Sequence, residues 1–151
     1  MSRPNVLYHG SSRELEGETL NPSWGDDSEE RPENNLFAVY ATDRKDLAVV
    51  MAMIGCKDVL GGSIDEYQDG KLNARIYGNY PSQEYIYLHY LPTDTFEQTK
   101  IDEHQFVSLV PVKPIKTEKI RVRDYLHLAR IATKEETDKW IKKYGKKKTT
   151  P

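Results

Sequence analysis

The 151 residues of this chain include 22 Lys and Arg against 24 Asp and Glu, and 37% of them are hydrophobic, which is typical of a globular protein. The formal net charge of −2 gives no overall attraction to nucleic acid or membrane, and no segment is apolar and long enough to span a bilayer. Cys56 is the only cysteine, which excludes a disulfide framework and a thiolate zinc site. The N-terminus lacks the apolar core of a signal peptide, so we expect a cytoplasmic protein.

Two strands and a helix are predicted in the first third of the chain. The run "NVLYHG" predicts a short strand, and the turn formers after it indicate a loop. Residues 25–35, "GDDSEERPENN", are rich in carboxylates without an apolar anchor and indicate a mobile acidic loop that could act as a lid. "LFAVYATD" from Leu36 predicts a buried strand. The helix after it has Asp43 as the expected N-cap and Gly55 as its end. Its expected apolar face is formed by Leu47, Val50, Met51 and Ile54.

The second half of the chain predicts a hairpin, two further strands and a terminal helix. Asp69 and Gly70 are typical of a hairpin turn, and the tyrosine-rich residues 77–90 predict a strand with two usable faces. "HQFVSLVPVKPI" from His104 predicts another strand, which Pro111 and Pro114 should confine to an edge or a bulge. The capping box formed by Thr133 and Glu136 predicts a last helix that ends at Gly145.

Common catalytic signatures are absent from the sequence. The four histidines, His9, His89, His104 and His127, show no zinc-ligand spacing, so no metal site is expected. Dinucleotide-binding, P-loop and hydrolase-elbow motifs are missing as well. Asp102, Glu103 and His104 form a titratable cluster that could perform general acid–base work, although charged residues before a strand are more often only solvated.

Three short segments suggest a family when their order is considered. "YHGS" comes first, "AVYATD" with its helix follows about thirty residues later, and "EHQFVS" with "PVKPI" lies late in the chain. This order resembles the ADP-ribosyltransferase superfamily, whose sites combine a histidine, a tyrosine and a late carboxylate or other polar residue. "YIYLHYLPTDTF" and "IRVRDYLHL" look like the late strands of the family, so the resemblance covers most of residues 5–128.

The resemblance implies NAD as substrate and assigns roles to particular residues. His9 would hydrogen-bond a hydroxyl of the adenine-side ribose. The backbone of Gly10 would approach the nicotinamide carboxamide, with Ser11 completing this segment. Tyr40 would face the nicotinamide ring, and the small Ala41 would leave room beside it. No metal is required by this chemistry.

The third position differs from the usual glutamate of the family. Gln105 aligns there and can hydrogen-bond a ribose hydroxyl, but it offers a dipole instead of a charge to the cationic transition state. Glu103 lies two residues earlier and would share a face with Gln105 if both were in a strand. Glu103 could supply the missing carboxylate, contact the acceptor, or be the catalytic residue in a register shifted by two. The sequence leaves these alternatives open.

The expected architecture is α+β, an ADP-ribosyltransferase-like split β-sandwich of two small, mainly antiparallel sheets with flanking helices. One domain would cover residues 1–145, followed by a basic disordered tail at 146–151. The expected function is NAD-dependent mono-ADP-ribosyl transfer or NAD hydrolysis, with an acceptor that the sequence does not identify. Two alternatives remain: a weak or inactive module that binds NAD or ADP-ribose, and a protein or nucleic-acid interaction domain built on the tyrosine-rich strand and the lysine-rich end.

Overall fold

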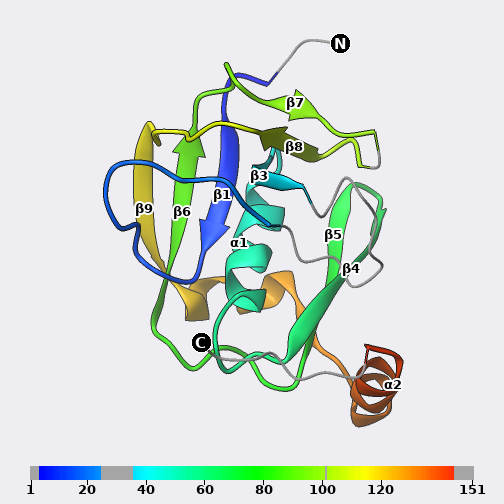
Figure 1. Cartoon of the computed structure of the whole chain (residues 1–151). Helices are drawn as coiled ribbons and strands as arrows, with labels where there is room; N and C mark the ends of the chain where they lie inside the picture. Colours follow the sequence, from blue (N-terminus) through cyan, green and yellow to red (C-terminus); the bar gives the residue numbers. More distant parts are fainter. Residues whose placement is uncertain (1–3, 25–35, 101, 145–151) are drawn as a thin grey trace.

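Two β-sheets and a helix between them form the framework of the computed structural model (Figure 1), which describes residues 4–24, 36–100 and 102–144. The larger sheet has the strand order β7-β8-β3-β1-β6-β9, and β2 pairs with β3 outside this path. The smaller sheet has the order β10-β5-β4. The predicted α+β class with mainly antiparallel sheets is confirmed, although one sheet is larger than expected. The predicted acidic loop 25–35 and the tail 146–151 lie outside the described residues.

The strands of the larger sheet are β1 (Leu7–Ser11), β2 (Ser23–Trp24), β3 (Phe37–Thr42), β6 (Tyr85–Leu91), β7 (Glu97–Gln98), β8 (Gln105–Ser108) and β9 (Lys116–Arg121). Those of the smaller sheet are β4 (Gly61–Gln68), β5 (Lys71–Tyr77) and β10 (Arg130–Ile131). The helical elements are α1 (Lys45–Ile54), the 3-10 helix η2 (Val122–Leu128) and α2 (Lys134–Tyr144). No helix in the described ranges is long and apolar enough to cross a membrane.

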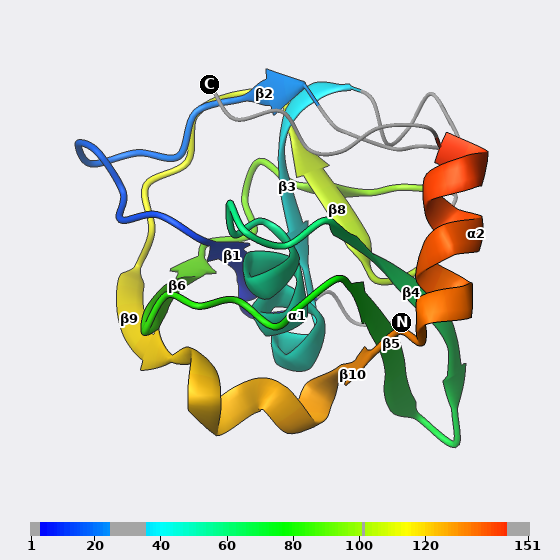
Figure 2. The ribbon, with the colours of Figure 1, turned by 90° about the horizontal axis from the view of Figure 1, so that it is seen from below.

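Helix α1 packs against β1 and β6 of the larger sheet and also contacts β5 and η2 (Figure 2). Because it is covered on more than one side, its buried surface is wider than the single predicted stripe and includes Ala48, Val49 and Ala52. Met51, which was expected on the buried face, is 50% exposed. The predicted N-cap is also wrong: Arg44 occupies that position without a side-chain cap, while Gly55 follows the last turn as expected.

The hairpin β4–β5 and helix α2 follow the turn and cap chemistry of the sequence. Asp69 and Gly70 have positive φ angles of 52° and 76°, which is the conformation that a tight hairpin turn requires. Thr133 Oγ1 accepts a hydrogen bond from the Glu136 backbone N–H, and a Glu136 carboxylate oxygen accepts one from the Thr133 N–H. The predicted hairpin turn and capping box are confirmed, while Gly145, the predicted end of the helix, lies outside the described residues.

The late strands differ from the prediction in their limits. β8 ends at Ser108 and lies inside the sheet, between β7 and β3. Pro111 and Pro114 fall in the connection to β9, which forms the sheet edge, so neither proline has to fit into a ladder. The expected strand "IRVRDYLHL" is wrong beyond Arg121, because the chain continues as η2.

Candidate functional site

Three neighbouring strands, β8, β3 and β1, carry the residues that the sequence predicted for the site, with the exception of Glu103 (Figure 1). Tyr8 of β1 pairs with Thr42 of β3, and Thr42 pairs with Gln105 of β8. Segments that lie more than sixty residues apart in the chain are therefore side by side in the sheet.

His9 is held in a defined orientation on β1. Its Nδ1 lies 2.6 Å from the carbonyl oxygen of Tyr40, and because a carbonyl only accepts, Nδ1 carries the proton. Burial lowers the pKa of His9, while the bond to Tyr40 acts in the opposite direction. The imidazole is therefore neutral at pH 7, and its Nε2 is an acceptor with no partner in the described part of the chain. Such a nitrogen can accept a hydrogen bond from a hydroxyl group.

The side chains of His9 and Tyr40 leave the sheet on opposite faces. Val39 and Ala41 pack with Leu7 in a core cluster away from α1, so Tyr40, between them, points to the α1 face. His9 follows the alternation of Leu7 and points away from α1. The structure thus joins the two residues through the Tyr40 carbonyl and does not bring their rings together.

Tyr40 and Gln105 belong to the same face of the larger sheet. Tyr40 pairs with Val107, and Gln105 lies two residues before Val107 in β8. The Tyr40 hydroxyl donates to the Leu36 carbonyl at 2.7 Å, and burial raises the pKa of Tyr40. The Gln105 Oε1 accepts a hydrogen bond of 2.9 Å from the Thr99 hydroxyl. This face combines an aromatic ring with an oriented amide.

Gly10 and Ser11 have structural roles that the sequence did not reveal. A Cβ on Gly10 would lie 1.9 Å from the Ala48 carbonyl oxygen, so the glycine permits close packing of α1 on β1. The Ser11 hydroxyl donates to the Arg13 carbonyl at 2.8 Å and accepts from the Arg13 N–H at 3.2 Å, forming a turn at the end of β1.

Glu103 lies in the turn before β8, not in a strand. The strand alternation that would place Glu103 and Gln105 on one face therefore does not apply. The Glu103 side chain is 74% exposed, and one of its oxygens lies 3.5 Å from His104 Nε2. Its nearest described ionisable partner is thus the neighbouring histidine.

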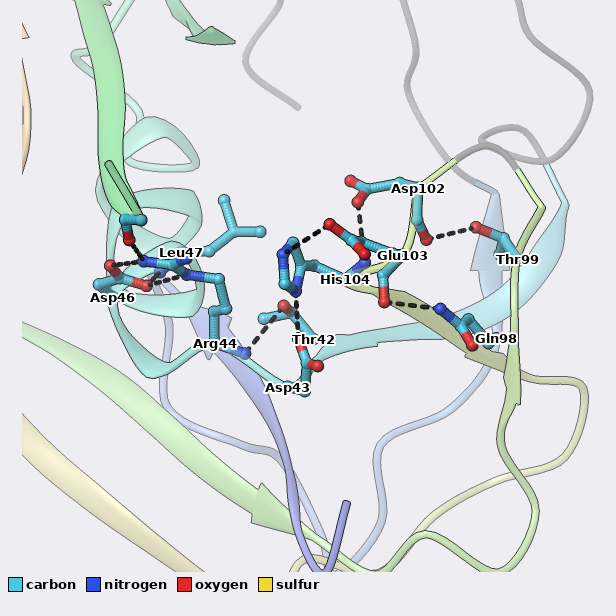
Figure 3. Close-up of polar contacts among 11 residues, drawn as sticks. Thr42, Asp43, Arg44, Asp46, Leu47, Gln98, Thr99, Asp102, Glu103 and His104 are labelled. Atoms are coloured by element: carbon cyan, nitrogen blue, oxygen red, sulfur yellow. Dashed lines mark hydrogen bonds and ion pairs between the residues drawn. The ribbon is translucent and has the colours of Figure 1, made fainter. Parts of the chain in front are cut away.

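His104 and Asp43 form a dyad at the adjoining ends of β8 and β3 (Figure 3). His104 Nδ1 lies 2.8 Å from Asp43 Oδ1, and the His104 backbone N–H donates to Asp102 Oδ1 at 2.8 Å. The sequence singled out Asp102, Glu103 and His104 but assigned Asp43 to a helix cap. Asp43 directly follows Thr42, and His104 directly precedes Gln105. Because Thr42 and Gln105 pair across β3 and β8, only this strand pairing reveals that Asp43 meets His104.

His89 is a second residue that the sequence analysis missed. It pairs with His9 across β6 and β1, and the two rings stack with centroids 6.0 Å apart. His89 is fully buried, its Nδ1 lies 2.7 Å from Thr117 Oγ1, and its Nε2 has no partner among the described residues. Burial and, to a lesser extent, His9 lower the pKa of His89 to about 4. The pair therefore keeps this part of the sheet uncharged at neutral pH.

Basic residues accompany the tyrosine-rich strand from its neighbour β9. The Nζ of Lys119 lies 4.4 Å from the ring centroid of Tyr85, and that of Lys116 lies 4.4 Å from that of Tyr90. The two pairs occupy opposite faces of the sheet, because Tyr85 and Tyr90 differ by an odd number of positions. They do not form one continuous surface.

Two surface hollows, of about 330 and 320 Å³, lie elsewhere. One is lined by residues of α1 and η2, including Lys45 and Tyr125, and the other by residues before β6 and in η2, including Tyr80 and Val122. Neither is lined by a predicted site residue. In the described ranges, no group of three or more His, Cys, Asp or Glu side chains could hold a metal ion.

Comparison of the chain with protein-family models, curated proteins and solved structures gave no match.

Proposed function

We propose that this protein has an ADP-ribosyltransferase-like fold and acts on NAD as a mono-ADP-ribosyltransferase or NAD glycohydrolase. The observation that carries the proposal is the order β8-β3-β1, which places the predicted polar, tyrosine and histidine segments side by side in one sheet. Tyr40 and Gln105 add to it, because their side chains belong to the same face of this sheet.

In this proposal, the chain binds NAD and stabilises the charge that develops on the ribose. Tyr40 faces the nicotinamide and Gln105 bonds the nicotinamide-side ribose on the α1 face, while His9, on the opposite face, holds the Tyr40 backbone through its Nδ1. Cleavage of the bond between nicotinamide and ribose leaves positive charge on the sugar, which oriented dipoles stabilise. The reaction as proposed uses no metal ion.

Gln105 limits the expected turnover. An amide oxygen carries only a partial charge, so it stabilises a cationic transition state less than a carboxylate does. A module that binds NAD without turnover is therefore the second candidate function, and the same residue favours it.

Nicotinamide release from NAD, measured together with NAD affinity by calorimetry, tests the proposal. We expect measurable affinity that falls about fivefold in Gln105→Ala, because a lost hydrogen bond is worth roughly 1 kcal/mol. Gln105→Glu should raise the release rate and Gln105→Ala should lower it. His127→Ala is the matched control, since His127 is exposed on η2 and outside the site.

The outcomes separate the candidate functions. Affinity without nicotinamide release supports the binding module, whereas the absence of NAD binding contradicts both candidates. Equal effects of Gln105→Ala and His127→Ala would also contradict the assigned role of Gln105.

A further inference from the structure

We infer that His104, oriented by Asp43, is the general base that removes the proton of a hydroxyl acceptor. This inference rests on the proposed function and specifies the class of acceptor, which is water or an alcohol. The His104–Asp43 dyad is built from the two strand ends next to Gln105 (Figure 3).

The contacts of His104 resemble those of an imidazole prepared for proton transfer. The Asp43 carboxylate accepts the Nδ1 proton at 2.8 Å, which directs Nε2 to the side away from Asp43. A carboxylate in this position also stabilises the imidazolium that forms when Nε2 takes up a proton. The side chains of His104 and Asp43 are 21% and 30% exposed, so the dyad is partly buried but in contact with solvent.

The Glu103 carboxylate lies beside His104 Nε2, in a position that the hydroxyl group of an acceptor could take instead. Its carboxylate oxygen lies 3.5 Å from Nε2, which is longer than an ordinary hydrogen bond, and its side chain is 74% exposed. Little burial is lost when this side chain turns toward solvent. A hydroxyl oxygen can then take its place beside the imidazole.

The dyad lies one residue beyond the Thr42–Gln105 pair, in which Gln105 is proposed to bond the ribose. Thr42 and Gln105 pair across β3 and β8, and Asp43 and His104 extend them at the same end of the sheet. A base at this end would lie beside the ribose that Gln105 contacts in the proposed function. No other histidine in the described ranges bonds to a carboxylate.

The proposed step balances without a further reactant. The bond between the ribose C1′ and the nicotinamide nitrogen breaks, and its electron pair leaves with nicotinamide, which is neutral and needs no acid. The acceptor oxygen forms a bond to C1′, and its proton passes to His104 Nε2 and then to solvent. A carboxylate acceptor has no proton to remove, so this base indicates hydroxyl acceptors.

Two measurements on the same protein separate this base from the rest of the site. Formation of ADP-ribose from NAD requires the acceptor step, whereas exchange of labelled nicotinamide into NAD requires only cleavage and its reversal. We expect His104→Asn to lower ADP-ribose formation by roughly 100-fold while exchange continues, because general bases contribute about 10²- to 10⁴-fold. Asp43→Asn should have the same selective effect but a smaller one, as expected for a positioning residue.

Rescue distinguishes a base from a structural histidine. Free imidazole should restore ADP-ribose formation to His104→Ala in proportion to its concentration and should not affect His127→Ala. His104→Asn keeps a donor toward Asp43, so it also serves as the variant to use if His104→Ala does not fold.

Two results would overturn the inference in distinguishable ways. In the first case, the native protein exchanges nicotinamide, but variants at His104 either form ADP-ribose at the native rate or lose both reactions equally. This result overturns the role of His104 alone. Native protein that neither exchanges label nor forms ADP-ribose overturns the proposed function, and the role of His104 with it.

Discussion

Two different requirements can explain a glycine at position 10: a bare backbone beside a ligand, or close packing of α1 on β1. The sequence alone does not distinguish them. The proposed contact with nicotinamide needs a bare backbone, but packing of α1 on β1 already excludes any side chain there. A Cβ at Gly10 would lie 1.9 Å from the Ala48 carbonyl oxygen and 2.9 Å from the Ala52 Cβ. The glycine is therefore required by the fold whether or not a ligand binds.

Gly10→Ala should lower the free energy of unfolding by about 3 kcal/mol, at the upper end of ordinary overpacking, because backbone has to move. Urea unfolding measures this change. Gly55→Ala is the matched control: Gly55 has φ −73°, and its added Cβ would meet neighbours only at 3.4 Å and beyond. We expect that control to stay within about 0.5 kcal/mol of the native protein or to be slightly more stable. Equal stabilities of both variants would show that α1 does not approach β1 this closely.

At the scale of elements, local chemistry was predictable and pairing across strands was not. Turn and cap residues act on their own neighbours, so the hairpin at Asp69 and the capping box at Thr133 could be predicted from a few letters. Asp43 is the opposite case, because whether it caps a helix or binds His104 depends on which strand lies beside β3. The pairing of His9 with His89 has the same origin. The sequence singled out candidate residues one by one, but it predicted neither their arrangement over two faces nor the contacts of Asp43 and His89.

Helix α2 is held mainly by a ring contact and a charged network. Trp140 stacks on Tyr77 with centroids 4.9 Å apart and lies over Gly61, where a Cβ would be 2.6 Å from the indole. Glu136 bonds Arg130 and Arg75 and accepts from the Thr133 N–H. None of the residues of α2 is fully buried. Its attachment therefore depends strongly on the ionised state of Glu136.

Acid should release α2 before the rest of the protein unfolds. Arg130, the Thr133 N–H and Arg75 hold the pKa of Glu136 well below its usual range. A depressed pKa stabilises the folded state above the unfolded value of about 4.3, and this contribution is lost as the pH falls below it. Trp140 fluorescence, recorded in a Trp24→Phe background, should report the release, since the chain has two tryptophans.

Substitutions within the first turn of α2 provide the control for this release. Glu136→Gln should weaken the attachment already at neutral pH and flatten the acid transition. Glu135→Gln should leave it unchanged, because Glu135 is 79% exposed and its ion pair with Lys139 contributes little. An acid transition that Glu136→Gln leaves unaltered would contradict the role of this network.

At the scale of the whole molecule, β1 and β6 pair in the larger sheet and bring together two neutral histidines, His9 and His89. Burial lowers the pKa of both His9 and His89, so folding requires imidazoles that have lost their protons. This requirement costs stability in acid, where the two imidazoles would otherwise take up protons.

The free energy of unfolding should fall as the pH drops from about 6.5 toward 4. Below the ordinary histidine pKa of about 6.5, the unfolded chain takes up protons that the folded protein excludes. Proton uptake then stabilises the unfolded chain relative to the folded state. With the pKa of His89 at about 4, this residue alone accounts for a loss of about 3 kcal/mol. Urea unfolding at intervals across this range measures the slope. His89→Asn, which can still bond Thr117, should reduce the slope, whereas His127→Asn should not. The range lies above the one expected for Glu136, so a native slope retained in His89→Asn would contradict a neutral His89 in the folded protein.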